Sequence, residues 1–250
     1  MLGSMAQSLD RGLRILDEIA VGRTTLGEIA DSLGVHKTTV LRLLATLQEH
    51  HLVYREDANH YRLGGRLFDL AAFALDSRQV VSQARGPMRR LAQSTGYGVY
   101  LATLEGGGAM VVEVAAGRGL LQTGLRVGVA LPLHATASGK VLLSGLSVRK
   151  RVEVLVGYEF LAMTERTLGT RADLEAAVER ATAQGFSLEV GEHELYVNAA
   201  AAPVRDSTGG VVAALAVTVP GVYSEEGGLT RCIPALLAGA AEISHDLGCG

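Results

Sequence analysis

The stretch at 36–48 combines basic and short polar side chains and contains no acidic residue. The residues at its start that could bind a ligand are His36, Lys37, Thr38, Thr39 and, one helical turn later, Arg42. Lysine and arginine bind phosphate oxygens, and short hydroxyl side chains reach both phosphates and base edges. The N-terminus of a helix also favours phosphate. The pattern therefore predicts a surface that contacts double-stranded DNA.

Two predicted helices and a tight turn would position this surface. Thr25 and Glu28, three residues apart, form the pattern of a capping box at the start of the first helix. Gly34 can adopt the left-handed conformation that ends that helix. The second helix is expected over 36–49, because its apolar residues recur at spacings of three and four, at Val40, Leu43, Leu44 and Leu47. A helix, a glycine turn and a second helix form the helix-turn-helix pattern.

A two-stranded hairpin, or wing, is predicted after the second helix. Residues 52–55 and 60–63 alternate around the turn at 57–59, and Arg55, His60 and Arg62 would lie along it. The candidate DNA-binding residues are Thr25, His36, Lys37, Thr38, Thr39, Arg42, Arg55 and Arg62. The alternative is a helical hairpin used for protein contact, with a few solvated charges. The combination of a helix, a glycine turn, an acid-free basic helix and a basic hairpin favours the DNA-binding interpretation.

Composition and charge limit the other possibilities. The formal net charge of −3 gives no global argument for nucleic-acid binding, so the prediction depends on where the basic residues lie. A surface with few phosphate contacts per subunit implies a dimer. The cysteines, Cys232 and Cys249, exclude a disulfide framework and suit a reducing cytoplasm. The histidines lack metal-ligand spacing, so we expect no metal and no cofactor.

The sequence gives no sign of a membrane. The N-terminus has no apolar signal region, because charged residues interrupt it. The longest apolar stretch, 211–219, is too short to span a bilayer. We therefore expect a cytoplasmic protein without a membrane partner.

A second, larger domain is predicted beyond the hairpin. A linker helix over 66–77 would join a winged helix-turn-helix domain at 8–65 to a domain at 78–250. The apolar side of this helix either contacts a second subunit or packs against its own domain. Hairpin strands with helices before, between and after them indicate the α+β class. We expect strands at 98–104, 109–115, 120–129, 186–190, 199–204 and 211–219, and helices at 80–94, 135–144, 147–156, 171–184 and 229–247.

The run from Ala135 to Lys140 places small residues at the start of a predicted helix. Small side chains let a ligand approach the backbone, and the helix N-terminus offers N–H groups to an anion. A Walker phosphate loop is rejected, because it needs glycine where His134 stands and serine or threonine where Val141 stands. Close packing of helix on sheet, without any ligand, is the alternative.

Together these segments resemble the IclR family of bacterial transcription regulators over essentially the whole chain from Ser8. The N-terminal match consists of SLDRGLRIL, LGEIADSLGVHKTTVLRLLATL and YRLGGRLFDL, in the family's order and spacing. The C-terminal match consists of LPLHATASGK, QGFSLEVGEHE, AAPVRD and VVAALAVTVP. The resemblance implies a winged helix-turn-helix domain, a linker helix and a GAF-like effector-binding domain, in homodimers that often pair into homotetramers.

In IclR-like proteins the effector pocket is lined by the helix start at 135–140 and by neighbouring strands. Carried onto this chain, the resemblance implies that the effector-binding residues are Leu120, Thr123, Leu131, Ala137, Ser138, Glu189, Val197, Ala199, Ala216 and Thr218. Glu189 stands where the family often has aspartate, at the polar end of the pocket. Surface exposure is the alternative for Glu189.

Two departures from the family pattern bear on the effector. Tyr196 and Ala199 replace a glycine and a cysteine, and Ala216 with Thr218 replaces a pair of serines. The pocket should therefore be more apolar than those that bind the smallest 2-oxo acids. This favours a small carboxylate that is aromatic or otherwise partly apolar.

The sequence thus predicts a DNA-binding transcription regulator, a repressor, that responds to a small-molecule effector and is not an enzyme. An enzyme fused to a DNA-binding domain would use His134, Ser138 or Glu189, but no nucleophile–base–acid set can be assembled around them. A second alternative is a ligand-independent DNA-binding regulator whose C-terminal domain serves oligomerisation.

Overall fold

The computed structural model describes residues 7–76, 79–117, 125–224 and 228–249. The chain forms two compact units that divide between Ser77 and Arg78. Both units mix helices with antiparallel strands, which confirms the predicted α+β class. Within the described ranges, no helix is long and apolar enough to cross a membrane.

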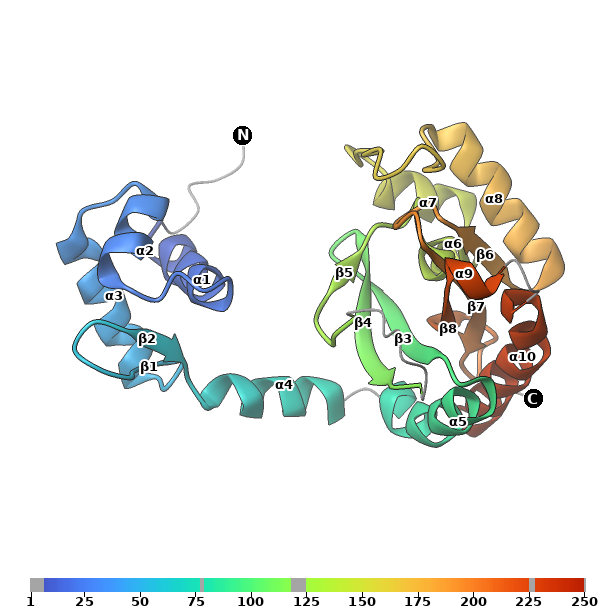
Figure 1. Cartoon of the computed structure of the whole chain (residues 1–250), viewed down its shortest axis with the longest axis horizontal. Coiled ribbons are helices and arrows are strands. Elements are labelled where there is room, and N and C mark those ends of the chain that lie inside the picture. The colour runs from blue at the N-terminus through green and yellow to red at the C-terminus, as the bar shows by residue number, and fades with distance from the viewer. Residues whose placement is uncertain (1–6, 77–78, 118–124, 225–227, 250) are drawn as a thin grey trace. The chain divides into compact units, whose positions relative to one another are not determined.

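The first unit consists of helices around a small apolar core, followed by a hairpin and a further helix (Figure 1). Its elements are α1 (Gln7–Ala20), α2 (Leu26–Leu33), α3 (Lys37–Glu49), β1 (Val53–Arg55), β2 (Tyr61–Leu63) and α4 (Arg66–Asp76). The core is formed by one side of each of the first three helices and by the hairpin, through Ile15, Ile19, Ile29, Val40, Leu44, Val53 and Tyr61. The helix-turn-helix and wing predicted from the sequence are therefore both present.

The capping box predicted for α2 is present. The Thr25 hydroxyl accepts a hydrogen bond from the Glu28 backbone N–H at 3.3 Å, and the Glu28 carboxylate accepts one from the Thr25 N–H at 2.9 Å. Gly34 ends α2 in the left-handed conformation, with φ of 63°, and its N–H returns to carbonyls of the last turn. The Tyr61 N–H donates to the Thr24 carbonyl at 2.8 Å, so the hairpin is tied to the start of α2.

Removing the Thr25 hydroxyl should destabilise the first unit. We expect Thr25→Ala to lower its free energy of unfolding by about 1 kcal/mol, because an N–H group at the start of α2 loses its acceptor. Thr46→Ala is the matched control, since the Thr46 hydroxyl only donates to the Arg42 carbonyl of its own helix at 3.3 Å. Urea unfolding of both variants measures the difference, and equal stabilities would contradict the capping assignment.

The second unit is built on a six-stranded antiparallel sheet in the order β5–β4–β3–β8–β7–β6. Its strands are β3 (Gly98–Glu105), β4 (Gly108–Ala115), β5 (Ala130–Leu131), β6 (Ser187–Val190), β7 (Val197–Arg205) and β8 (Val211–Pro220). This order brings β3 and β8, which are far apart in the sequence, together at the centre of the sheet.

Helices cover both faces of this sheet (Figure 1). α5 (Gln79–Thr95) and α10 (Gly228–Asp246) pack on one face, and α6 (Ala137–Ser144), backed by α8 (Arg171–Gln184), packs on the other. Two short helices, α7 (Val148–Val154) and α9 (Gly221–Ser224), complete the described elements. The buried alanines of β7 and β8 leave room for helices on both sides, at Ala199, Ala200, Ala201, Ala202, Ala213, Ala214 and Ala216.

The strand predicted at 120–129 is wrong for the residues that the structure describes. Residues 118–124 lie outside the described ranges, and 125–129 form turns and irregular chain before β5. Gly128 has a φ of 90°, and its N–H bonds to the Val111 carbonyl at 2.8 Å, so the chain meets β4 without a regular ladder. The β-branched residues Val127 and Val129 suggested a strand, but they are 48% and 38% exposed and lie in irregular chain rather than in a buried strand. The helix α9 was not predicted.

Candidate functional site

The N-terminal half of α3 presents a polar side to the solvent. Val40 and Leu44 are fully buried on the opposite side of the helix, which fixes its orientation. The candidates exposed on the polar side are His36, Lys37, Thr38 and Arg42, with Thr39 half-buried beside them. His36 is the residue that precedes the helix, and its Nδ1 atom lies 3.1 Å from the Thr38 hydroxyl. The structure thus gathers these five candidates at one helix start.

The other candidate DNA contacts already have partners inside the first unit. Arg62 Nε donates to Glu56 at 2.7 Å, and Arg55 bonds the Ala58 carbonyl while its guanidinium lies 6.0 Å from the Tyr61 ring centroid. Thr25 is engaged in the capping box. In contrast, neither Lys37 nor Arg42 forms an ion pair with another described residue. The two cations of α3 are therefore the best placed to meet phosphate.

The candidate effector residues of the second unit gather on the sheet face that packs against α6. Glu189, Ala199 and Thr218 lie directly opposite one another on β6, β7 and β8. Residues that pair across antiparallel strands share one face. Seven candidates are buried there, at Leu131, Ala137, Ser138, Glu189, Ala199, Ala216 and Thr218, and Val197 is half-buried. Leu120 and Thr123 lie outside the described residues.

The start of α6 is already occupied by groups of this chain. The Thr136 hydroxyl accepts the Gly139 N–H at 3.2 Å, and the Glu189 carboxylate accepts the Ala137 N–H. The His193 N–H also donates to Glu189, at 3.3 Å. Two of the first three N–H groups of α6 therefore have acceptors. The expectation that the N–H groups at this helix start are free to bind an anion is therefore wrong for Ala137 and Gly139.

Glu189 is a buried acid, and its side chain is only 3% exposed, which rules out the surface alternative. Burial raises its pKa to about 7, although the N–H groups of His193 and Ala137 and the charge of Lys140 lower it, and Glu192 raises it further. A substantial share of the molecules therefore carries a protonated Glu189 near neutral pH.

Tyr100, which sequence reasoning did not select, belongs to the same cluster. Its hydroxyl donates to the Ser138 hydroxyl at 3.1 Å, and Tyr100 lies opposite Ala216 on β8. Burial raises the pKa of Tyr100, with the Glu189 charge as a further cause, so its hydroxyl stays protonated. Side chains alternate between the two faces of the strand predicted at 98–104, and this alternation could have placed the Tyr100 side chain on the inner face.

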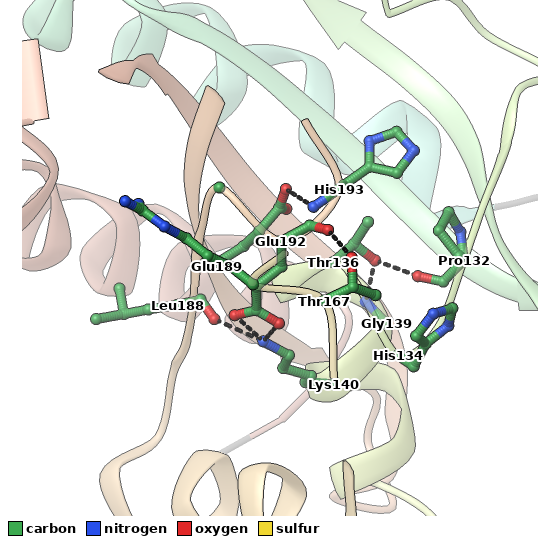
Figure 2. A network of polar contacts seen from close by, with 12 residues as sticks. Pro132, His134, Thr136, Gly139, Lys140, Thr167, Leu188, Glu189, Glu192 and His193 are labelled. Carbon is green, nitrogen blue, oxygen red and sulfur yellow. Dashed lines mark hydrogen bonds and ion pairs between the residues drawn. The ribbon is translucent and has the colours of Figure 1, made fainter. Parts of the chain in front are cut away.

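Lys140 forms an ion pair next to this cluster (Figure 2). Its Nζ atom lies 2.6 Å from each carboxylate oxygen of Glu192 and 3.0 Å from the Leu188 carbonyl. The Lys140 side chain is 3% exposed. The Thr167 hydroxyl donates to the Glu192 carbonyl at 2.7 Å, so the loop after β6 is held by α6 through Lys140 and by the segment before α8 through Thr167. The partners lie 52 residues apart, and no local pattern could reveal the pair.

His134 is occupied on both ring nitrogens. Nε2 lies 3.1 Å from the Leu161 carbonyl, and Nδ1 lies 2.8 Å from the Tyr158 hydroxyl. A carbonyl can only accept, so we assign the proton to Nε2 and an acceptor function to Nδ1. His134 therefore holds the segment around Leu161 and has no lone pair left for a substrate. Among the described residues, no three metal-ligating side chains gather either.

Close packing accounts for part of the small-residue run. A Cβ added to Gly139 would lie 2.4 Å from the Leu133 carbonyl oxygen, so only glycine lets α6 approach this segment. Tyr196, expected to affect the pocket, is 75% exposed and points its side chain to the solvent. Of the two residues that replace the family's glycine and cysteine, Tyr196 and Ala199, only Ala199 is buried on the α6 face.

Comparisons with known proteins agree with this arrangement. The model of the IclR helix-turn-helix domain matches residues 8–57, and that of the bacterial transcriptional regulator IclR C-terminal domain matches residues 72–245. The HTH-type transcriptional regulator XynR of Escherichia coli is 31% identical over 245 residues, which cover 97% of each chain. The HTH-type transcriptional repressor AllR of Salmonella typhi is 31% identical over 86% of this chain and 80% of its own.

A solved structure shows the same fold with a ligand. An IclR homolog from Microbacterium hydrocarbonoxydans, complexed with 4-hydroxybenzoate, superposes with a TM-score of 0.82 at 26% sequence identity. The match covers 96% of this chain and 98% of that one.

Proposed function

The chain belongs to the IclR family of bacterial transcriptional regulators, which are not enzymes, and we propose that it is a cytoplasmic repressor whose operator binding is changed by a small carboxylate. The observation that carries the proposal is the exposed polar start of α3, with two cations that form no ion pair among the described residues. The repressor relatives support the sign of regulation.

DNA would be read by two subunits. A single α3 offers few phosphate contacts, so two recognition helices entering successive major grooves of a near-palindromic operator would supply the affinity. Exposed apolar side chains on α1 and α4 support self-association of the first unit, because Leu9, Leu13 and Phe68 are 64%, 54% and 77% exposed. We infer a homodimer, or a homotetramer formed by two dimers.

The effector would bind on the α6 face of the second unit. The cluster there combines alanines with Tyr100, Ser138 and Glu189, which suits a small ligand with an apolar body and a polar end. The 4-hydroxybenzoate held by the Microbacterium relative supports an aromatic carboxylate. The effector would alter DNA binding only by binding the two conformational states with different affinity.

A second candidate, a DNA-binding regulator without an effector, is favoured by one observation. Two of the first three N–H groups of α6 already bind Thr136 and Glu189, so this chain itself satisfies part of the expected ligand site. In that case the second unit would serve oligomerisation only.

A mobility-shift experiment with the DNA upstream of the protein's own gene separates these candidates. We expect a specific shift, and we expect one compound in a panel of 4-hydroxybenzoate, benzoate, pyruvate and glyoxylate to weaken it. The same compound should raise the melting temperature, because a ligand selective for the native state stabilises it. A specific shift that no compound changes would favour the second candidate, and no specific shift would contradict the DNA-reading assignment of α3.

A further inference from the structure

The acidic groups outnumber the cations at the polar end of the α6 face. Glu189 is buried there between β6 and the start of α6. The titratable groups around it are Tyr100 from β3, Lys140 from α6, and Glu192 and His193 from the loop after β6. Lys140 is the one lysine or arginine of this set, and its Nζ atom lies 2.6 Å from both carboxylate oxygens of Glu192. Among the residues that the structure describes, Glu189 therefore has no cation paired with it alone.

The remaining neighbours in the described part of the chain do not supply a positive charge. The His193 backbone N–H points at Glu189, while its ring points away from the carboxylate (Figure 2). Burial lowers the pKa of His193, so its ring is neutral at neutral pH. The Tyr100 hydroxyl is protonated and already donates to Ser138. An ionised carboxylate brought to this end would thus meet a second carboxylate, while the Lys140 charge is already paired with Glu192 and no other described neighbour supplies a cation, which is unfavourable in a buried site.

A shared proton removes this conflict. Two carboxyl groups in contact cannot both ionise, and the pair then holds one proton in a hydrogen bond between them. We propose that a carboxylate effector binds to the α6 face together with one proton from the solvent, which lies between its carboxylate and that of Glu189. Glu189 thereby becomes a specificity-determining residue. This inference rests on the proposed function, because it assumes a carboxylate effector on this face.

The structure sets the expected pH dependence. With a Glu189 pKa of about 7, the protonated fraction falls about tenfold between pH 6 and pH 8. We therefore expect the affinity for 4-hydroxybenzoate, whose carboxylate is ionised at both values, to fall about tenfold over that interval. Glutamine is isosteric with the protonated acid and can still donate through its amide. In Glu189→Gln we expect affinity to be retained at pH 8 and to become independent of pH.

Titration calorimetry on the full-length protein tests the proposal with 4-hydroxybenzoate as the probe. Measurements at pH 7 in two buffers of different ionisation enthalpy count the protons taken up, and we expect an uptake of at least half a proton by the wild type and none by Glu189→Gln. Glu179→Gln is the matched control, because Glu179 is exposed on α8, and it should behave as the wild type does.

The outcomes separate this inference from the proposed function. Tighter binding at pH 6 with proton uptake, abolished in Glu189→Gln only, supports it. Binding that is equal at pH 6 and pH 8, or that takes up no proton, overturns the shared proton but leaves the carboxylate effector standing. Absence of binding at pH 6 overturns the inference as well. The mobility-shift panel then decides independently whether the proposed function survives.

Discussion

Replacing Arg42 with alanine is expected to weaken operator binding about thirtyfold or more. Arg42 lies on the exposed side of α3, one turn after Thr38, and forms no ion pair with another described residue. A contact of arginine with phosphate or with a base edge contributes about 1–3 kcal/mol. A dimer loses the contact twice, so about 2 kcal/mol is the lower expectation, which corresponds to the stated factor.

A mobility-shift titration of the wild type and Arg42→Ala at one salt concentration measures this loss. Arg149→Ala is the matched control, because Arg149 is an exposed arginine of the second unit whose one ion pair with a described residue is to Glu153 of its own helix. Repeating the titration at several salt concentrations identifies the contact. A reduced salt dependence indicates a phosphate, and relaxed sequence preference indicates a base. Unchanged affinity in Arg42→Ala would show that α3 docks differently from the model proposed above.

The first unit was predictable because its signals are local. The capping box uses two residues three apart, and the turn uses one glycine in the left-handed conformation. The periodic apolar residues of α3 decide which side faces the core, and thereby which side is left exposed for the proposed contact with DNA. The wing candidates were placed correctly, but their hydrogen bonds to Glu56 and Ala58 depend on how the hairpin turns and could not be foreseen.

The second unit was predictable in its elements and less so in its site. Buried hairpin strands such as β3 and β8 show alternation or long apolar runs, whereas β5 has only two residues and follows exposed valines. The ion pair of Lys140 with Glu192 and the bond from Tyr100 to Ser138 join residues that only the sheet order brings together. Glu189 was selected through the family resemblance. The hydrogen bond that its carboxylate accepts from the Ala137 N–H at the start of α6 could be identified only in the folded chain.

Glu189 should make the stability of the second unit depend on pH in an unusual direction. Its pKa is about 7 in the folded protein and 4.5 as the ordinary value. Below pH 4.5 the Glu189 carboxyl group is protonated in both the folded and the unfolded chain, so its ionisation does not lower the free energy of unfolding. As the pH rises, the unfolded chain releases this proton first, so unfolding becomes more favourable until about pH 7. The full loss amounts to about 3 kcal/mol, and it persists above that pH.

The comparison of the wild type with Glu189→Gln isolates this effect from all other carboxyl groups. We expect Glu189→Gln to gain stability relative to the wild type by about 3 kcal/mol between pH 4.5 and pH 8. Calorimetric unfolding at equal protein concentration measures the difference, which keeps any contribution of oligomerisation the same in both proteins. A constant difference across this range would mean that Glu189 ionises in the folded protein at its ordinary pKa. The buried carboxyl group would then have a compensating partner, and the argument for a proton bound together with the effector would fail at its first step.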